Sequence, residues 1–198
     1  MPRLRLHRFE TDVPDMTDIA YLPETPAHDH AIDLINEEAF GPGRYTRAAY
    51  KIREGGPHER TLSFVACEGD QVVASVRMTR IAAGFGRALL LGPLAVIPAK
   101  KNLGIGRKLV AIALEAAREA GFGVVVLVGD APYYGPLGFA RIPYDQITMP
   151  RPVDRDRLLA CEMVEGSLAL LQGDVVHEDR VAASLLPVHG EKVARRAG

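Results

Sequence analysis

The sequence predicts an α/β fold in which helices cover both faces of a mixed sheet. Two helical segments come early in the chain, strands joined by tight turns follow, and one strand–helix–strand unit comes next. Tight turns join antiparallel strands, whereas a crossover through a helix places its two strands in parallel. With 198 residues, 47% of them hydrophobic, one domain is expected over residues 18–186. Residues 1–17 are interpreted as an N-terminal extension and residues 187–198 as a basic tail.

The first elements are short and are ended by proline or glycine. Residues 19–22 are predicted to form a strand that stops at a proline. A helix over residues 27–40 follows and stops at Gly41, because neither glycine nor proline supports a continuing helix. A second helix is predicted over residues 47–54.

The middle of the chain is predicted to form an antiparallel meander. Residues 62–67, 71–81 and 87–97 are the three strands, with turns at residues 69–70 and 84–86. The last of these strands is long and strongly apolar.

A strand–helix–strand unit begins with that last strand. Its helix covers residues 104–120 and is followed by Gly121, which suits a left-handed cap. Residues 124–128 are five consecutive apolar residues, as expected of a strand buried on both faces. A helical turn and three closing strands are predicted after it: residues 132–137, 142–148, 158–164 and 168–176.

Charge and composition exclude several classes of partner. The chain has 24 basic and 25 acidic residues, which predicts no nucleic acid partner. Its apolar runs are far shorter than the roughly 20 residues of a transmembrane helix, and its N-terminus lacks the apolar core of a signal peptide, so no membrane association is predicted. Cys67 and Cys161 lack metal-ligand spacing, so no metal site is predicted and a reducing cytoplasm is the expected setting.

The turn between residues 97 and 105 has the chemistry of a phosphate site. Gly104 and Gly106 lie where an apolar strand passes into the long helix. A helix N-terminus has four unpaired N–H groups and about half a positive charge, and glycine lets a bulky anion approach them. Several cations surround this point: Lys100, Lys101, Arg107 and Lys108. A diphosphate group suits this turn.

Two other phosphate motifs do not fit this turn. The dinucleotide fingerprint needs a glycine three residues after Gly106, where Leu109 stands. The P-loop needs Gly-Lys-Ser/Thr after a four-residue gap, which is missing. A plain strand-to-helix turn, in which the glycines only relieve strain, remains the alternative.

A second segment, residues 129–139, narrows the interpretation. It places Tyr134 four residues before a Gly-Phe pair, and residues 101–106 read Lys-Asn-Leu-Gly-Ile-Gly. Together these segments resemble the signature of the Gcn5-related N-acetyltransferase superfamily, over roughly residues 19–176. The Gly-Asp-x-x-Tyr-Tyr run and residues 162–168 are similar to a bacterial branch of it. Lys101 departs from the usual glutamine or arginine and lacks the forked geometry of arginine.

The resemblance implies an acyl-CoA N-acyltransferase fold with a mixed, mostly antiparallel sheet of about seven strands. It implies acetyl transfer from acetyl-CoA, a cosubstrate, to a primary amine by direct attack, with Tyr134 protonating the departing thiolate. A core aromatic is the alternative for Tyr134. The residues it implies for binding the cosubstrate are Leu94, Ala95, Val96, Lys101, Asn102, Leu103, Gly104, Ile105, Gly106, Arg107, Asp130 and Tyr133.

The acceptor side is less determined by the sequence. The candidates for a general base are Glu37, Glu38, His58 and Glu59, each also readable as an ordinary surface residue, and a water chain is the alternative. Arg77 and Arg80 lie on a predicted strand, where a basic residue could contact an acidic acceptor, and solvent-facing structural residues are the favoured alternative. Cys161 is expected to be a small core residue. A small-molecule or peptide amine is the expected acceptor, and the apolar C-terminal strands are compatible with a homodimer. A non-catalytic acyl-CoA-binding module is the alternative function.

Overall fold

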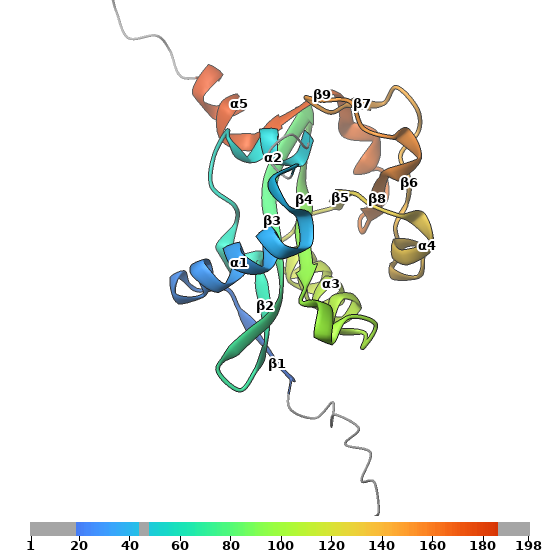
Figure 1. Ribbon diagram of the computed structural model, residues 1–198. Coiled ribbons are helices and arrows are strands. Elements are labelled where there is room, and N and C mark those ends of the chain that lie inside the picture. Colours follow the sequence, from blue (N-terminus) through green and yellow to red (C-terminus); the bar gives the residue numbers. More distant parts are fainter. Residues whose placement is uncertain (1–18, 44–47, 186–198) are drawn as a thin grey trace, which may run out of the picture.

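The computed structural model describes residues 19–43 and 48–185, and within these ranges nine strands form one sheet (Figure 1). The extension predicted for residues 1–17 and the tail predicted for residues 187–198 lie outside the described residues. The strands are β1 (Ile19–Pro23), β2 (Phe64–Glu68), β3 (Gln71–Gly84), β4 (Gly86–Val96), β5 (Val124–Val128), β6 (Ala140–Arg141), β7 (Ile147–Thr148), β8 (Leu158–Glu162) and β9 (Leu171–His177).

The sheet has the order β1-β2-β3-β4-β5-β8-β6, in which the meander precedes one crossover. Neighbours from β1 to β4 are antiparallel, and β4 and β5 are parallel because the helix between them carries the chain back. The 14-residue strand β3 has two partners along one edge, β2 near its start and β9 near its end. The predicted mixed sheet is confirmed.

Five α-helices and several short 3-10 turns surround the sheet in the described part of the chain. The α-helices are α1 (Asp29–Phe40), α2 (Ala48–Arg53), α3 (Ile105–Glu119), α4 (Ala131–Tyr134) and α5 (Glu178–Leu185). Among the 3-10 turns, η5 (Pro98–Lys100) precedes α3 and η6 (Gly135–Leu137) follows α4. None of the described helices is both long and apolar enough to cross a bilayer.

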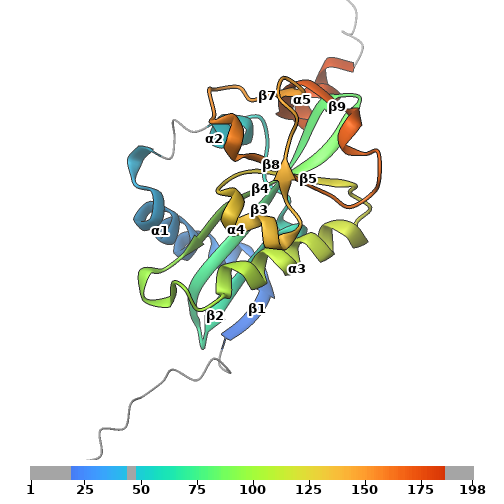
Figure 2. The same ribbon diagram turned by 90° about the vertical axis from the view of Figure 1, so that its right-hand side faces the viewer.

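Alternation along β4 shows that helices cover both faces. Leu89 and Leu91 belong to a cluster with Leu109 of α3, whereas Leu90 packs with Ile52 of α2 on the other face. Successive side chains of a strand point to opposite faces, so each strand of the centre contributes to two cores. Figure 2 shows α3 lying across the sheet on its own face.

Most predicted elements are confirmed within a residue or two, and the end of the domain is not. The strand predicted over residues 142–148 is wrong. A turn with Asp145 in the left-handed region (φ +64°) separates the two-residue strands β6 and β7. The strand predicted from residue 168 begins at Leu171 after a 3-10 turn, and α5 was not predicted at all.

Candidate active site

The parallel strands β4 and β5 separate soon after they meet. Their paired residues are Leu89 with Val125 and Leu90 with Val126, although β4 continues for six residues. Gly92 follows with φ +126°, a region that favours glycine, and the register of β3 shifts opposite it. A register shift of this kind bends a strand and increases its twist. The end of β4 is therefore directed away from β5.

The separated end of β4 presents backbone groups on its β5 side. The Ile97 N–H donates to the Val73 carbonyl of β3 at 3.0 Å, which fixes the direction of its neighbours. Backbone groups alternate along a strand, so those of Leu94 and Val96 face away from β3. An extended ligand lying there would find donors and acceptors in the pattern of an added strand.

The N-terminus of α3 lies next to this edge. Gly104 precedes the helix with φ +80°, and a Cβ placed on it would meet no atom within 4 Å. Gly104, Ile105 and Gly106 line the cleft, so the first turn of α3, whose N–H groups have no partner within the helix, borders it. Lys101 and Arg107 are exposed beside this turn, whereas the Lys100 ammonium is bound to the Glu68 carboxylate. At this turn, Lys101 and Arg107 line the cleft without a protein ion pair among the described residues.

One cleft of about 1200 Å³ joins the turn, the end of β4 and the two tyrosines. The lining residues include every predicted binding residue except Leu103, which is exposed outside it. In chain order they are Leu94, Ala95, Val96, Lys101, Asn102, Gly104, Ile105, Gly106, Arg107, Asp130, Tyr133 and Tyr134. Segments far apart in sequence are thus brought to one wall.

The two tyrosines of α4 occupy different environments. Tyr134 packs edge-on against Phe139, with ring centroids 5.7 Å apart, and a Cβ on Gly129 would lie 2.3 Å from its ring. Burial raises the pKa of Tyr134 to about 12. Tyr133 instead lies against α3, where its ring stacks with the Arg107 guanidinium at 5.4 Å. Its hydroxyl would be 2.7 Å from a Cβ on Gly106, so a side chain there would displace the tyrosine.

The opposite wall comes from the first two helices, the loop that follows them and strand β3. Its polar lining residues are Asp33, Asn36, Tyr50, Arg53, His58 and Arg77. Sequence reasoning found only His58 and Arg77 among them. Nothing in the pattern of residues 47–54 distinguishes Arg53 from a surface arginine, because its position depends on how α2 meets β4.

A buried carboxylate organises this wall. The Glu24 side chain is fully buried and accepts hydrogen bonds from His58 Nε2 at 2.8 Å, Arg60 Nη1 at 2.8 Å and Arg77 Nη2 at 2.9 Å. Burial raises the pKa of this carboxyl, but the hydrogen bonds from His58 and Arg77 lower it by a larger amount. The pKa of Glu24 therefore lies below its ordinary value. Asp29 also binds both arginines. Sequence reasoning missed Glu24.

The four candidates for a general base lie in different surroundings. Of the base candidates only His58 lines the cleft: Glu37 and Glu38 are exposed outside it, and Glu59 binds Thr61 and Arg80.

The expectation that the side chain faces solvent is wrong for Arg77, which is only 15% exposed because it reaches the buried Glu24. Arg80 is 45% exposed, as expected. Cys161 is a buried core residue, as predicted, and burial raises the pKa of its thiol.

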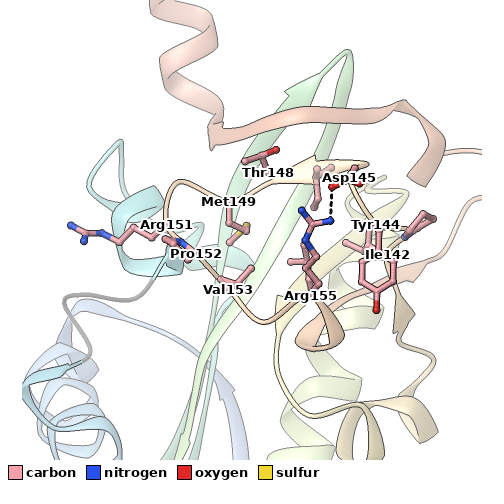
Figure 3. Close-up of a pocket in the computed structure, with 12 residues that line it drawn as sticks. Ile142, Tyr144, Asp145, Thr148, Met149, Arg151, Pro152, Val153 and Arg155 are labelled. Atoms are coloured by element: carbon pink, nitrogen blue, oxygen red, sulfur yellow. Dashed lines mark hydrogen bonds and ion pairs between the residues drawn. The ribbon is translucent and has the colours of Figure 1, made fainter.

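A smaller pocket of about 260 Å³ borders the cleft, and Pro152 and Val153 line both (Figure 3). Figure 3 shows the Arg155 guanidinium directed at Asp145, with which it forms an ion pair. The pocket lies among the turns that replace the predicted strand over residues 142–148.

Comparison with known proteins agrees with this geometry. The model of the family described as "Acetyltransferase (GNAT) family" matches residues 28–139. A relative from Escherichia coli (strain K12), "Uncharacterized N-acetyltransferase YjhQ", is 25% identical over 173 residues, which cover 84% of this chain and 88% of the relative.

Two solved structures share the fold. The GNAT family N-acetyltransferase YhbS from Escherichia coli, solved in complex with CoA, has a TM-score of 0.69 and 21% identity over 83% of this chain and 92% of its own. A GNAT family acetyltransferase from Brucella melitensis, solved in complex with acetyl-CoA, has a TM-score of 0.59 and 26% identity, covering 80% of this chain and 95% of its own. The predicted acyl-CoA N-acyltransferase fold is confirmed.

Proposed function

The chain belongs to the acetyltransferase (GNAT) family, and we propose that it transfers an acetyl group from acetyl-CoA to a primary amine by direct attack. One observation carries the proposal: the separated edge of β4, the N-terminus of α3 and Tyr134 all line a single cleft. Two relatives of the same fold were solved with CoA or acetyl-CoA. A cleft with these three features has a place for a diphosphate, an extended arm and a departing thiolate.

The residues present fit acetyl-CoA as cosubstrate. The α3 N-terminus, with Lys101 and Arg107 beside it, would hold the pyrophosphate. The backbone groups of Leu94 and Val96 would pair with the amide-containing arm. Tyr133 closes the space between these two regions by lying against Arg107. The cosubstrate supplies an acetyl thioester, whose carbonyl carbon accepts the amine.

Each chemical role then has a group in this chain. The outward N–H of Leu94 or Val96 would stabilise negative charge on the acetyl oxygen, a contribution of about 3 kcal/mol for one such donor. Tyr134 would donate its phenolic proton to the sulfur as the carbon–sulfur bond breaks. With a pKa of about 12, this phenol stays protonated throughout the physiological pH range. The proton is therefore available at every turnover.

His58 is the group we assign to accept the proton that the amine loses. Its Nε2 lies 2.8 Å from Glu24 Oε1, so a proton on Nε2 is held by the carboxylate and Nδ1 keeps its lone pair. A carboxylate behind an imidazole also stabilises the imidazolium that forms. His58 lines the same cleft as Tyr134, on the opposite wall.

The proposal is tested by measuring release of free CoA thiol from acetyl-CoA in the presence of a panel of amines. The variant Tyr134→Phe removes only the hydroxyl group and is expected to lower kcat at least about tenfold while the Kd for CoA stays nearly constant. Tyr144→Phe is the matched control, because Tyr144 is exposed and lines the smaller pocket. Unchanged kcat in Tyr134→Phe would remove Tyr134 from the mechanism.

The same panel separates the enzyme from a non-catalytic acyl-CoA-binding module. A binder would show tight CoA binding and no thiol release above the rate of spontaneous hydrolysis with any amine. Such a result would overturn acetyl transfer and leave only the binding part of the proposal.

A further inference from the structure

Arg53 is a charged side chain that lines the cleft and forms no ion pair with a carboxylate among the described residues. It is the last residue of α2 and lines the cleft near β4. Its Nε atom is buried, and its N–H donates to no acceptor among the described residues. Its Nη2 atom lies 4.0 Å from the place that a Cβ on Gly92 would occupy. The guanidinium is therefore held against the bend of β4.

The neighbouring arginine differs in this respect. Arg77 forms ion pairs with Glu24 and Asp29, so its charge is neutralised within the protein. Burial, with Arg77 adding repulsion, lowers the pKa of Arg53 to about 10, which still leaves Arg53 charged at neutral pH. A buried charge without a counter-ion is costly, and an anionic ligand would remove that cost.

The position of Arg53 excludes the pyrophosphate as this anion. Gly92 lies at the start of the separated part of β4, whereas the phosphate turn follows its end at Val96. Four residues of strand span roughly 13 Å. Gly92 is, however, only two residues before Leu94, whose outward N–H is one of the two candidates for the acetyl oxygen in the proposed function. The anion that Arg53 would bind therefore lies on the acceptor side, close to the reacting amine.

We propose that Arg53 binds the carboxylate of the acceptor and that the acceptor is a small amino acid, with its amine and carboxylate a few bonds apart. This proposal rests on the proposed acetyl transfer, and it names the substrate class of the same cleft. The planar fork of a guanidinium matches a carboxylate with two parallel hydrogen bonds.

Asn36 supports a polar acceptor on independent grounds. Its side chain is buried and lines the same cleft, and its Oδ1 has no hydrogen-bond partner among the described residues. An unpaired acceptor and an unpaired donor on one wall suit a ligand that carries both a carboxylate and a hydrogen-bond donor. An acceptor without polar groups beside its amine would leave both atoms unsatisfied.

The test compares matched acceptors in the CoA-thiol assay with the full chain. Each free amino acid is measured beside its methyl ester and beside the corresponding amine that lacks the carboxyl group. For the amino acid that the wild-type protein acetylates best, kcat/KM is expected to be about 10- to 100-fold higher than for its methyl ester. Arg53→Gln is expected to raise KM for the amino acid by a similar factor and to leave KM for the ester unchanged.

Three controls keep the result interpretable. Lys51 lies on the same helix but outside the cleft, so Lys51→Gln is expected to leave KM for the amino acid and KM for the ester unchanged. Arg53→Lys keeps the charge without the fork and is expected to restore part of the preference. The Kd for CoA, measured for each variant, is expected to stay constant, because the pyrophosphate site is at the other end of β4.

Two outcomes would contradict the proposals in different ways. Equal rates with amino acids, esters and carboxyl-free amines, unaffected by Arg53→Gln, would overturn the carboxylate site while acetyl transfer stands. CoA binding without thiol release for any acceptor would overturn the proposed function itself.

Discussion

Replacing Glu24 with glutamine tests whether one buried carboxylate stabilises the wall of the cleft opposite Tyr134, where His58 and Arg77 lie. The substitution keeps the shape of the side chain and removes its negative charge. In the native protein that charge faces His58 at 2.8 Å and also binds Arg60 and Arg77, all on segments distant in the chain. With glutamine, the arginines lose the counter-ion that they share in a site where the Glu24 side chain is completely buried.

The expected loss of stability is about 3 kcal/mol at pH 7. Breaking a buried ion pair by removing one partner costs roughly 3–5 kcal/mol. We take the lower end, because Asp29 remains bound to Arg60 and Arg77 and a glutamine oxygen still accepts one hydrogen bond. For a chain of this length the loss corresponds to a fall in Tm of about 6–12 °C.

The pH dependence gives the prediction its sign. The folded protein holds the pKa of Glu24 below its ordinary value of 4.5: burial acts to raise it, and hydrogen bonds from His58 and Arg77 lower it by more. A carboxyl whose pKa is lowered on folding contributes stability above the unfolded pKa and loses it as the pH falls through the folded pKa. The difference between wild type and Glu24→Gln should thus be constant from pH 7 to about pH 5 and shrink below it.

Urea denaturation at pH 7, 5 and 4 measures this difference in the free energy of unfolding. Glu115→Gln is the control, because Glu115 is 60% exposed and its ion pair is with Arg118 along the same helix. Its effect is expected to stay within about 0.5 kcal/mol. A Glu24→Gln variant as stable as the control at pH 7, or a difference that grows toward pH 4, would refute the reasoning.

Two further predictions concern the cosubstrate wall of the cleft. Gly129→Ala places a methyl group against the Tyr134 ring and is expected to lower the free energy of unfolding by about 1–3 kcal/mol. It is also expected to lower kcat, because the methyl group displaces Tyr134. Gly135→Ala, where a Cβ meets nothing within 4 Å, is the neutral control in the same denaturation and thiol assays. Arg107→Gln is expected to raise the Kd for CoA several-fold at low ionic strength and less at 0.5 M salt, because exposed charge is screened; an increase that is the same at both salt concentrations in a binding titration would contradict an electrostatic role.

Local signals in the sequence were sufficient for the centre of the fold. Residues 104–120 have a helical apolar period and a terminal glycine, and α3 covers Ile105–Glu119 with Gly121 in the left-handed region. The five apolar residues of β5 form a strand as predicted, because a strand of this composition has few alternatives. The turn at Gly104 and Gly106 was recognisable for the same reason, since its glycines and cations are contiguous in the chain.

Weak local signals failed where neighbours in space decide the structure. Residues 142–148 contain strand-forming isoleucine, tyrosine and threonine, yet only Ile147 and Thr148 form a strand, which pairs with β9. Sheet pairing over so few residues depends on the partner strand and not on intrinsic preference. The helix α5 follows β9 without a break, and no glycine or proline at the junction of His177 and Glu178 marks the end of the strand.

The sequence by itself determined the α/β class, the strand–turn–helix at Gly104 and Gly106, and the motif that links this turn to Tyr134. Only the tertiary structure decided the other half of the cleft. Glu24, Arg53, His58 and Arg77 come from four segments, and no spacing relates them, because the sheet and the helices α1 and α2 bring them together. Whether an arginine is paired or unpaired depends on which carboxylates reach it, and that is fixed by packing alone.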